Sequence, residues 1–437
     1  MADRAPRPAP SVYTIPAHRS FADSLAAGLI RAHGREPMAL AGGRILLPNA
    51  RAVRTVTEAF VRASGSGLVL PRLIAIGDPE LDDRIGGALD PAGVAEPVPP
   101  AIDSLDRQLA LAALLRQPGE SVTESLRLAA DLGRALDQLT IEGVDPASLA
   151  AVAAERPELA GHWQASLDRV QAVLVHWPAE LARRGVIDLA DRRNRLLRQA
   201  AARWRASPPS GFTVAAGITT AAPAVADLLA AIAFMEDGMV VLPGLAGAKA
   251  MPDEEWDSLG PEEGKRGEET HPQYHLKLLL ERMGAARAEV ETWPSAGRSS
   301  SPAARSRAVV NAMVSASFSD KWSRLEPGER RLPGIRAAEF SDPASEALGI
   351  AIAVREALET PARTVALVTP DRSLAQRVSG HLQRWGIDAD DSAGKPLSQT
   401  AAGRLLLAAA SLAAEDFAPV PLLALLKHPL AGAKDRL

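Results

Sequence analysis

An acidic cluster near the end of the sequence is the most direct candidate for catalysis. Asp388, Asp390 and Asp391 bring three carboxylates close together, and paired carboxylates can hold Mg²⁺ for phosphoryl chemistry. The same spacing, followed by Ser392 and Gly394, is also typical of a solvated acidic turn. We favour the turn, and keep an enzymatic site at these carboxylates as an alternative.

An arginine-rich stretch between residues 191 and 206 could bind nucleic acid. At about 100° per residue of a helix, all of its arginines except Arg193 fall on one side, opposite Leu197, Ala200 and Trp204. Such a face could contact backbone phosphates. It could also be an ordinary charged face over a core, because Asp188 and Asp191 partly offset its charge. The arginines are Arg192, Arg193, Arg195, Arg198, Arg203 and Arg205.

The eight histidines show no ligand-like spacing. His271 and His275 lie four residues apart, as on one face of a helix, but Pro272 intervenes, so we predict no metal site there. We interpret His18 and His33 as surface or helix-capping residues. Tryptophans can stack on bases, but in helical patterns we expect them in the core. These are Trp163, Trp177, Trp204 and Trp385.

The sequence lacks the glycine-rich loop that binds phosphate in nucleotide motors. That loop, G-x-x-x-x-G-K-[ST], wraps phosphates with backbone N–H groups and neutralises them with its Lys. Its place would be the turn after the first predicted strand, but Pro16 to Ser20 contain neither Gly nor Lys. Gly394 and Lys395 are followed by Pro396, which supplies neither the hydroxyl nor a backbone donor. The hydrolase motifs H-E-x-x-H and G-x-S-x-G are also absent.

Composition narrows the class of protein. The chain has 437 residues, enough for roughly two to four domains. It has no cysteine, which excludes disulfides, zinc fingers and cysteine-bound clusters within these residues and fits a reducing cytoplasm. Its net charge of −4 means that any nucleic-acid contact must use a local basic patch or be shared with a partner. We expect a cytoplasmic protein without a membrane partner, because no apolar run approaches the roughly 18 residues of a membrane span.

Short apolar runs alternate with helical patterns, which predicts an α/β fold with a parallel sheet. We expect strands at Val12–Ile15, Arg44–Leu47, Leu68–Leu70, Leu73–Ile76, Phe212–Ala216, Met239–Leu242, Ile335–Phe340 and Val365–Val368. We expect helices at Phe21–Ala32, Ala50–Ala63, Pro223–Met235, His275–Ala285, Ser345–Leu358, Leu374–Trp385 and Leu422–Leu426.

The same patterns divide the chain into segments. Residues 1–10 are expected to be a disordered tail, and residues 103–206 an all-helical insertion. The insertion separates the first part of an α/β domain, 11–102, from its second part, 207–250. Residues 251–333 are expected to form a loop and helical linker, and 334–437 the incomplete start of a second α/β domain. Loops are expected at 82–100, 246–269 and 295–306, where Gly, Pro, Ser and acidic residues concentrate.

Seven stretches, in this order and spacing, resemble the AddB family of the alphaproteobacterial type, and the likeness runs from about Val12 to the end. The resemblance implies a RecA-like domain of superfamily 1 helicases, interrupted by a helical subdomain and followed by the truncated start of a second RecA-like domain. The stretches are Val12–Pro16, Ile45–Arg51, Leu70–Asp78, Val240–Leu245, His271–Tyr274, Ala366–Arg372 and Arg384–Leu397.

The resemblance also implies a nucleotide site that has lost its chemistry. Active helicases of this superfamily carry a Mg²⁺-binding segment, D-E-x-Q-D-x-x-P, followed by a Leu-Leu pair. With Pro223 and the Leu228–Leu229 pair in register, Ala216 and Gly217 occupy the Asp and Glu positions. Neither can bind a metal or orient a water. The degenerate site would comprise Pro16, His18, Arg19, Ser20, Ala216, Gly217 and Arg372.

In function, the family resemblance implies the DNA-scanning subunit of a helicase–nuclease that resects double-strand breaks for recombination. The resemblance implies that these residues contain no ATPase motor. It also implies that the subunit binds single- and double-stranded DNA and a Chi-like sequence, and that it pairs with the motor subunit AddA. The family's Mg²⁺-dependent nuclease and its cysteine-bound iron–sulfur cluster would lie beyond residue 437, leaving no cofactor in these residues. The alternatives are a scaffold for the motor subunit and an unrelated α/β enzyme acting on nucleotides. The candidate DNA-binding residues are Arg51, Arg192, Arg195, Arg198, Arg203 and Arg205.

Overall fold

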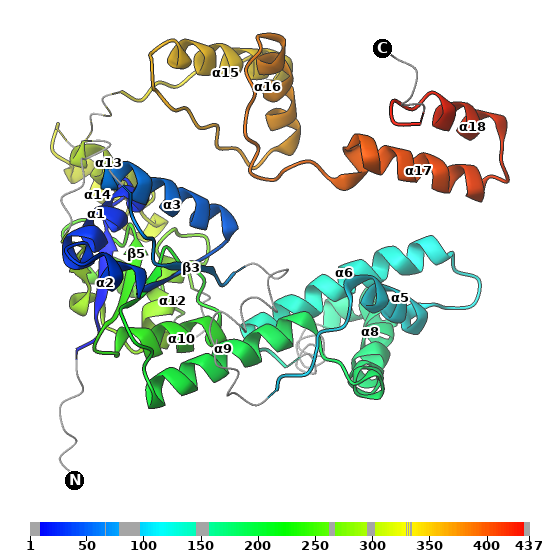
Figure 1. Cartoon of the computed structure of the whole chain (residues 1–437), viewed down its shortest axis with the longest axis horizontal. Coiled ribbons are helices and arrows are strands. Elements are labelled where there is room, and N and C mark those ends of the chain that lie inside the picture. The colour runs from blue at the N-terminus through cyan, green and yellow to red at the C-terminus, as the bar shows by residue number, and fades with distance from the viewer. Residues whose placement is uncertain are drawn as a thin grey trace. The chain divides into compact units, whose positions relative to one another are not determined.

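We analysed a computed structural model of the chain (Figure 1). It describes residues 9–65, 67–77, 97–145, 157–261, 267–294, 302–328, 330, 332 and 334–431, with the backbone alone at 37, 157–169, 172, 303 and 306. The expected tail falls outside these ranges up to residue 8, and the expected loop at 82–100 falls outside them up to residue 96. The chain divides into two compact units, Met1–Pro333 and Gly334–Leu437, and each is described by itself.

The first unit is built on a parallel sheet, so the α/β class is confirmed. Among the described residues the sheet has six strands in the order β3-β2-β4-β5-β1-β6. In register, Ile45 of β2 lies between Leu73 of β3 and Val214 of β4. The strands are β1 (Val12–Ile15), β2 (Arg44–Leu47), β3 (Arg72–Ala75), β4 (Thr213–Ala216), β5 (Gly238–Pro243) and β6 (Glu291–Thr292).

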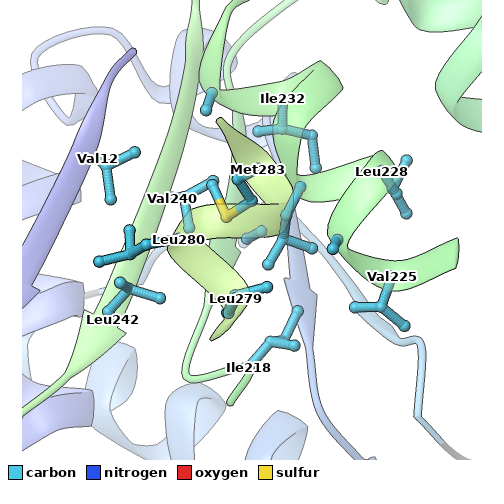
Figure 2. Packing of buried hydrophobic residues seen from close by; sticks show 14 of the residues in the cluster. Val12, Ile218, Val225, Leu228, Ile232, Val240, Leu242, Leu279, Leu280 and Met283 are labelled. Atoms are coloured by element: carbon cyan, nitrogen blue, oxygen red, sulfur yellow. The ribbon is translucent and has the colours of Figure 1, made fainter. Parts of the chain in front are cut away.

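Helices cover both faces of this sheet, because apolar residues point to each side of its central strands. Ile45, Val214 and Val241 pack on α1 (Phe21–His33) and α3 (Ala50–Ser64), next to the short α2 (Pro37–Ala41). On the opposite face, Leu46 and Val240 pack on α9 (Leu189–Ala206), α10 (Pro223–Ala233) and α12 (Tyr274–Met283). Figure 2 shows the second core, in which Val12, Val240 and Leu242 of the sheet meet Leu228, Ile232, Leu279 and Leu280 of the helices.

Between β3 and β4 the regular elements of the described residues are helices, as the sequence predicted. The helices are α5 (Ser104–Leu115), α6 (Val122–Glu142), α8 (Pro157–Arg184) and α9. Leu111, Leu132 and Trp177 belong to a separate core among α5, α6 and α8. The buried face of α9 instead joins the core of the sheet, so this helix is also part of the cover of the sheet. Among the described residues, no helix has both the length and the apolar character needed to cross a membrane.

Several local expectations were wrong. The segment Leu68–Leu70 forms no strand, because Pro71 lacks the N–H that a ladder needs and β3 begins only at Arg72. The loop expected at 246–269 contains α11 (Asp253–Asp257), and the loop expected at 295–306 runs into α13 (Ala303–Ala312). Residues 295–301 lie outside the described ranges.

The segment 251–333 is more than a linker, since it supplies β6, α12 and part of the core of the first unit. Strand β6 was missed because two residues carry no readable alternation. The rest of this segment forms η2 (Arg287–Glu289), η3 (Ala316–Phe318) and α14 (Lys321–Arg324).

The second unit forms helices but, within residues 334–431, no sheet, which corrects the expected second α/β domain. The predicted strands Ile335–Phe340 and Val365–Val368 are extended but have no ladder partner, and Val368 is 92% exposed. Helices α15 (Pro343–Leu358) and α16 (Arg372–Arg384) pack through Ala347, Ala351 and Val378. The helices η4 (Leu397–Gln399), α17 (Ala401–Ala414) and α18 (Pro419–Leu426) follow.

Candidate functional site

The residues of the predicted degenerate nucleotide site that belong to the first unit lie along the carboxyl edge of the sheet. Strand β5 lies between β1 and β4, and Ala216 at the end of β4 pairs in register with Val241. Just beyond the strands, the N–H of Gly217 donates to the Val241 carbonyl (3.0 Å) and the N–H of Gly244 donates to the Ile15 carbonyl (2.8 Å). The Ala216–Gly217 corner and the turn after β1 therefore lie on one edge, separated by one strand.

The turn after β1 is closed by a backbone hydrogen bond. The N–H of Arg19 donates to the Pro16 carbonyl (2.9 Å), and Pro16 has no N–H, so few backbone donors remain for an anion. The Ser20 hydroxyl donates to Asp23 (2.7 Å), which also pairs with Arg62 of α3 (2.7 Å). Burial alone would raise the pKa of Asp23, but these two contacts outweigh it and lower that pKa. A carboxylate in the first turn of α1 further disfavours an anion there.

The corner after β4 is apolar. Ala216 is fully buried, and Gly217 adopts a left-handed φ of 71°. A Cβ at Gly217 would lie 3.3 Å from the ring of Phe21, so glycine suits both the backbone and the space. Neither residue offers a carboxylate, so neither side chain can ligate Mg²⁺.

One cavity of about 520 Å³ adjoins the ends of β1, β5 and β6. His18, Asp253, Arg287 and Arg307 are its ionisable lining residues. Arg287 donates to Asp253 and to the Met251 carbonyl (2.9 Å), and its guanidinium lies 4.8 Å from the centre of the Trp256 ring. These contacts hold Arg287 as a structural residue.

A second cavity of about 1100 Å³ lies between the end of α6, the segment after β4 and the start of α12. Its polar lining includes Thr219, Thr220, Tyr274 and His275. Gln273 also lines it, but both ends of that amide are used: it donates to the Gly244 carbonyl (3.1 Å) and accepts from the Ala246 N–H (2.9 Å). Gln273 therefore joins the segment after β5 to α12.

Comparison of the sequence with protein-family models and with curated proteins gives no match. Function must therefore be inferred from the residues and their geometry.

Helix α9 presents the predicted arginine face outward. Its apolar side, with Leu197, Ala200 and Trp204, is buried, and Arg193 turns inward to donate to the Ile76 carbonyl (3.2 Å). The exposed arginines are Arg195, Arg198 and Arg205, whereas Arg192 and Arg203 are half-buried. Several are engaged within the protein: Arg195 pairs with Asp191 (2.8 Å), Arg205 pairs with Asp227, and Arg192 donates to the Pro99 carbonyl (3.0 Å).

The other candidates lie apart from this face. Arg51 is exposed near the start of α3. Arg372 belongs to the second unit, where both of its terminal nitrogens donate to Asp391 (2.9 and 2.6 Å), a contact that raises the pKa of Arg372. Asp388 and Asp390 are exposed, as is Asp391, and the N–H of Gly394 closes a turn on the Asp391 carbonyl. Within the described residues no cluster of acidic or histidine side chains suits a metal ion.

The aromatic candidates are mostly structural. Trp177 and Trp204 are buried, as predicted, and Trp385 packs beside the core of the second unit. The side chain of Trp163 lies outside the described ranges.

The histidines are not grouped. His271 is buried and accepts a hydrogen bond from the Gln273 N–H, while His275 is exposed. His33 is half-buried and stacks on Phe212 at 4.1 Å, so it is not a simple surface or capping residue.

A partly buried charge network joins the helices between β3 and β4, and sequence reasoning missed it. Arg107 of α5 donates to Asp188 (2.7 Å) and to Asp137 of α6 (2.9 Å), and the Trp177 indole donates to Asp188 (2.9 Å). Burial raises the pKa of Asp137, although Arg107 opposes that shift. The contacts join residues 30 and 81 positions apart, a separation that leaves no local sequence signal.

Proposed function

We propose that this chain is a DNA-binding guide derived from a helicase motor, with a RecA-like first domain that no longer hydrolyses nucleotide. In this proposal it is the DNA-scanning subunit of a cytoplasmic helicase–nuclease that resects double-strand breaks. It works with the motor subunit AddA, holds single-stranded DNA during unwinding of the duplex, and recognises a Chi-like sequence. Mg²⁺-dependent nuclease chemistry and an iron–sulfur cluster belong to other parts of the complex, since this chain has no cysteine to bind a cluster.

The carboxyl edge of the sheet carries this proposal. Ligands of open parallel sheets bind beyond the carboxyl ends of the strands. Here that edge keeps its strands and cavities, yet it has a closed turn at Pro16–Arg19 and an apolar corner at Ala216–Gly217. The two groups that phosphoryl transfer needs, a phosphate cradle and metal carboxylates, are both missing from these two places.

The outward face of α9 supports the DNA part of the proposal. Arginine is suited to phosphate because its planar guanidinium donates two parallel hydrogen bonds. Arg195 and Arg198 are exposed one turn apart, and a phosphate could replace Asp191 as the partner of Arg195. A net charge of −4 makes such a local patch necessary for affinity.

The test replaces Arg192, Arg195 and Arg198 with Ala in the full chain. We expect affinity for a single-stranded oligonucleotide to fall at least about tenfold, and the salt slope to fall by about 2, or about 0.7 for each lost phosphate contact. Fluorescence anisotropy over a range of salt concentrations measures both. The matched control is the triple replacement of Arg134, Arg183 and Arg184 by Ala, which removes the same charge from helices α6 and α8.

Two outcomes would contradict the proposal. An unchanged salt slope in the α9 variant would remove the arginine face from DNA binding. ATP hydrolysis by the purified chain above a blank would show that the edge retains a motor site.

A scaffold that binds only the motor subunit is the second candidate. It is favoured by the intramolecular partners of Arg195 and Arg205, and by exposed apolar residues such as Leu406 (65%) and Val420 (79%) in the second unit. Large exposed apolar surfaces usually mark protein interfaces. Electrophoretic shift of single-stranded DNA, with and without the motor subunit, separates the two candidates.

The enzyme alternative has less support. Asp388, Asp390 and Asp391 are exposed, and one of them is tied to Arg372. Together with Arg372 these carboxylates line one cavity of about 460 Å³, but all three remain exposed to solvent, where their pairing favours a surface turn over a catalytic site.

A further inference from the structure

Two arginines face each other at the opposite, amino edge of the sheet. Arg44 begins β2 and Arg72 begins β3, and the two are paired in register. Adjacent strands lie about 4.8 Å apart, and register partners point to the same face. Burial lowers the pKa of the half-buried Arg44, and the neighbouring charge of Arg72 lowers it further.

Nothing in the described part of the chain neutralises this pair. Arg44 donates to the Ser210 carbonyl (3.3 Å), and neither Arg44 nor Arg72 has a carboxylate within ion-pair distance among the described residues. Like charges directly opposite on neighbouring strands are destabilising. The exposed Glu236 and Asp237 precede β5, which is separated from β2 by β4.

A third residue, in register with Arg44 on the next strand, has a buried hydroxyl without a hydrogen-bond partner. Thr213 of β4 is the register partner of Arg44 on its other side. Thr213 is fully buried, and its hydroxyl has no hydrogen-bond partner. The row Arg72–Arg44–Thr213 thus combines two positive charges with an unused hydroxyl on one face of the sheet, the face that α9 and α10 cover.

The row adjoins the arginine-rich helix. α9 ends at Ala206, and the residues between it and β4 include Ser210, to which Arg44 is bonded. The last turn of α9 carries Arg203 and Arg205. Arg203 and Arg205 therefore lie a few residues along the chain from Ser210, whose carbonyl accepts from Arg44.

We infer that Arg44 and Arg72 form a phosphate-binding site that takes a backbone phosphate of the DNA strand held by α9. An arginine pair can offer parallel N–H donors to the oxygens of one phosphate, which also offsets the repulsion between the two guanidinium groups. The inference rests on the proposed DNA-binding function and extends the DNA contact to the edge of the sheet opposite the former nucleotide site.

The test compares Arg72→Gln with Arg127→Gln, an exposed arginine of α6, in the full chain. We expect Arg72→Gln to weaken binding of a single-stranded oligonucleotide about threefold to tenfold and to lower the salt slope by about 0.7. Its melting temperature should equal or exceed that of the wild type, because the substitution removes a like-charge neighbour. Millimolar inorganic phosphate should raise the melting temperature of the wild type and of Arg127→Gln, but not of Arg72→Gln, relative to chloride at equal ionic strength.

The outcomes separate this site from the proposed function. If the α9 triple variant loses DNA binding but Arg72→Gln does not, the phosphate site is overturned and the DNA guide stands. If neither variant loses binding, both fail. If phosphate protects the wild type while DNA binding of Arg72→Gln is unchanged, the site takes a free phosphate, which overturns its assignment to DNA.

Discussion

Extended apolar segments behave differently in the two units of this protein. In the first unit, β2 lies between β3 and β4, and Leu46 in its middle is fully buried. In the second unit, Ile335–Phe340 and Val365–Val368 are also extended and carry apolar residues, yet within residues 334–431 they pair with no strand. Two helices, α15 and α16, form the core of the second unit without them.

The difference shows that β-branched composition is not sufficient for a strand. Strand propensity reflects packing and pairing against neighbours more than an intrinsic backbone preference. The parallel strands β1, β2, β4 and β5 come from distant parts of the chain. Each strand supplies its neighbours with hydrogen bonds and a packed face. Where no such partners are present, an extended segment leaves its apolar side chains exposed.

The largest expected effect comes from a pair of side-chain truncations to alanine, one in each unit. Leu46→Ala should destabilise the first unit by about 3 kcal/mol, because it removes a fully buried side chain and leaves a cavity. Val368→Ala should change stability by less than about 0.5 kcal/mol, because that side chain is 92% exposed. Urea denaturation followed by tryptophan fluorescence measures both. Similar losses at the two positions would mean that the segment at Val368 is packed in a sheet after all.

A second pair of substitutions compares the ion pairs of the two units. Arg107→Leu should cost about 2 kcal/mol, because it leaves Asp137 and Asp188 without their shared partner among packed helices. Arg372→Leu should have no measurable effect on stability, because the Arg372–Asp391 pair is exposed to solvent. The melting temperatures of the two variants, measured by thermal unfolding, test this difference. Equal melting temperatures would contradict a structural role for the network.

The smallest expected effect concerns pH and has opposite signs in the two units. Hydrogen bonds from Ser345 and Ser341 lower the pKa of Asp342, the N-cap of α15, from 3.8 to about 2. Because this pKa is lower in the folded state, the cap stabilises α15 above pH 3.8 and loses that effect as pH falls toward 2. The pKa of Asp137 is raised by burial, so its protonation instead favours the folded first unit as pH falls.

Carboxyl titration by NMR would test this contrast, with Asp342→Asn as the variant that removes the pH dependence of α15. Titration of Asp342 near its ordinary value would contradict the cap, and a low pKa at Asp137 would contradict its burial.

The sequence by itself determined the parallel α/β class, five of the sheet's strands to within one residue at each end, the helices between β3 and β4, and the missing phosphate loop. These are local properties: short apolar runs, helical periodicity and the absence of a motif can be read from neighbouring residues. It also gave the outward arginine face of α9, because the spacing of a helix fixes which side chains share a side.

Only the tertiary structure decided which extended segments became strands and which charges met. The register that sets Arg44 beside Arg72, the pairing of Arg372 with Asp391, and the contacts of Arg107 with two helices all join residues far apart in sequence. A strand or an ion pair gains its free energy from a partner, and the position of that partner depends on the packing of the whole unit.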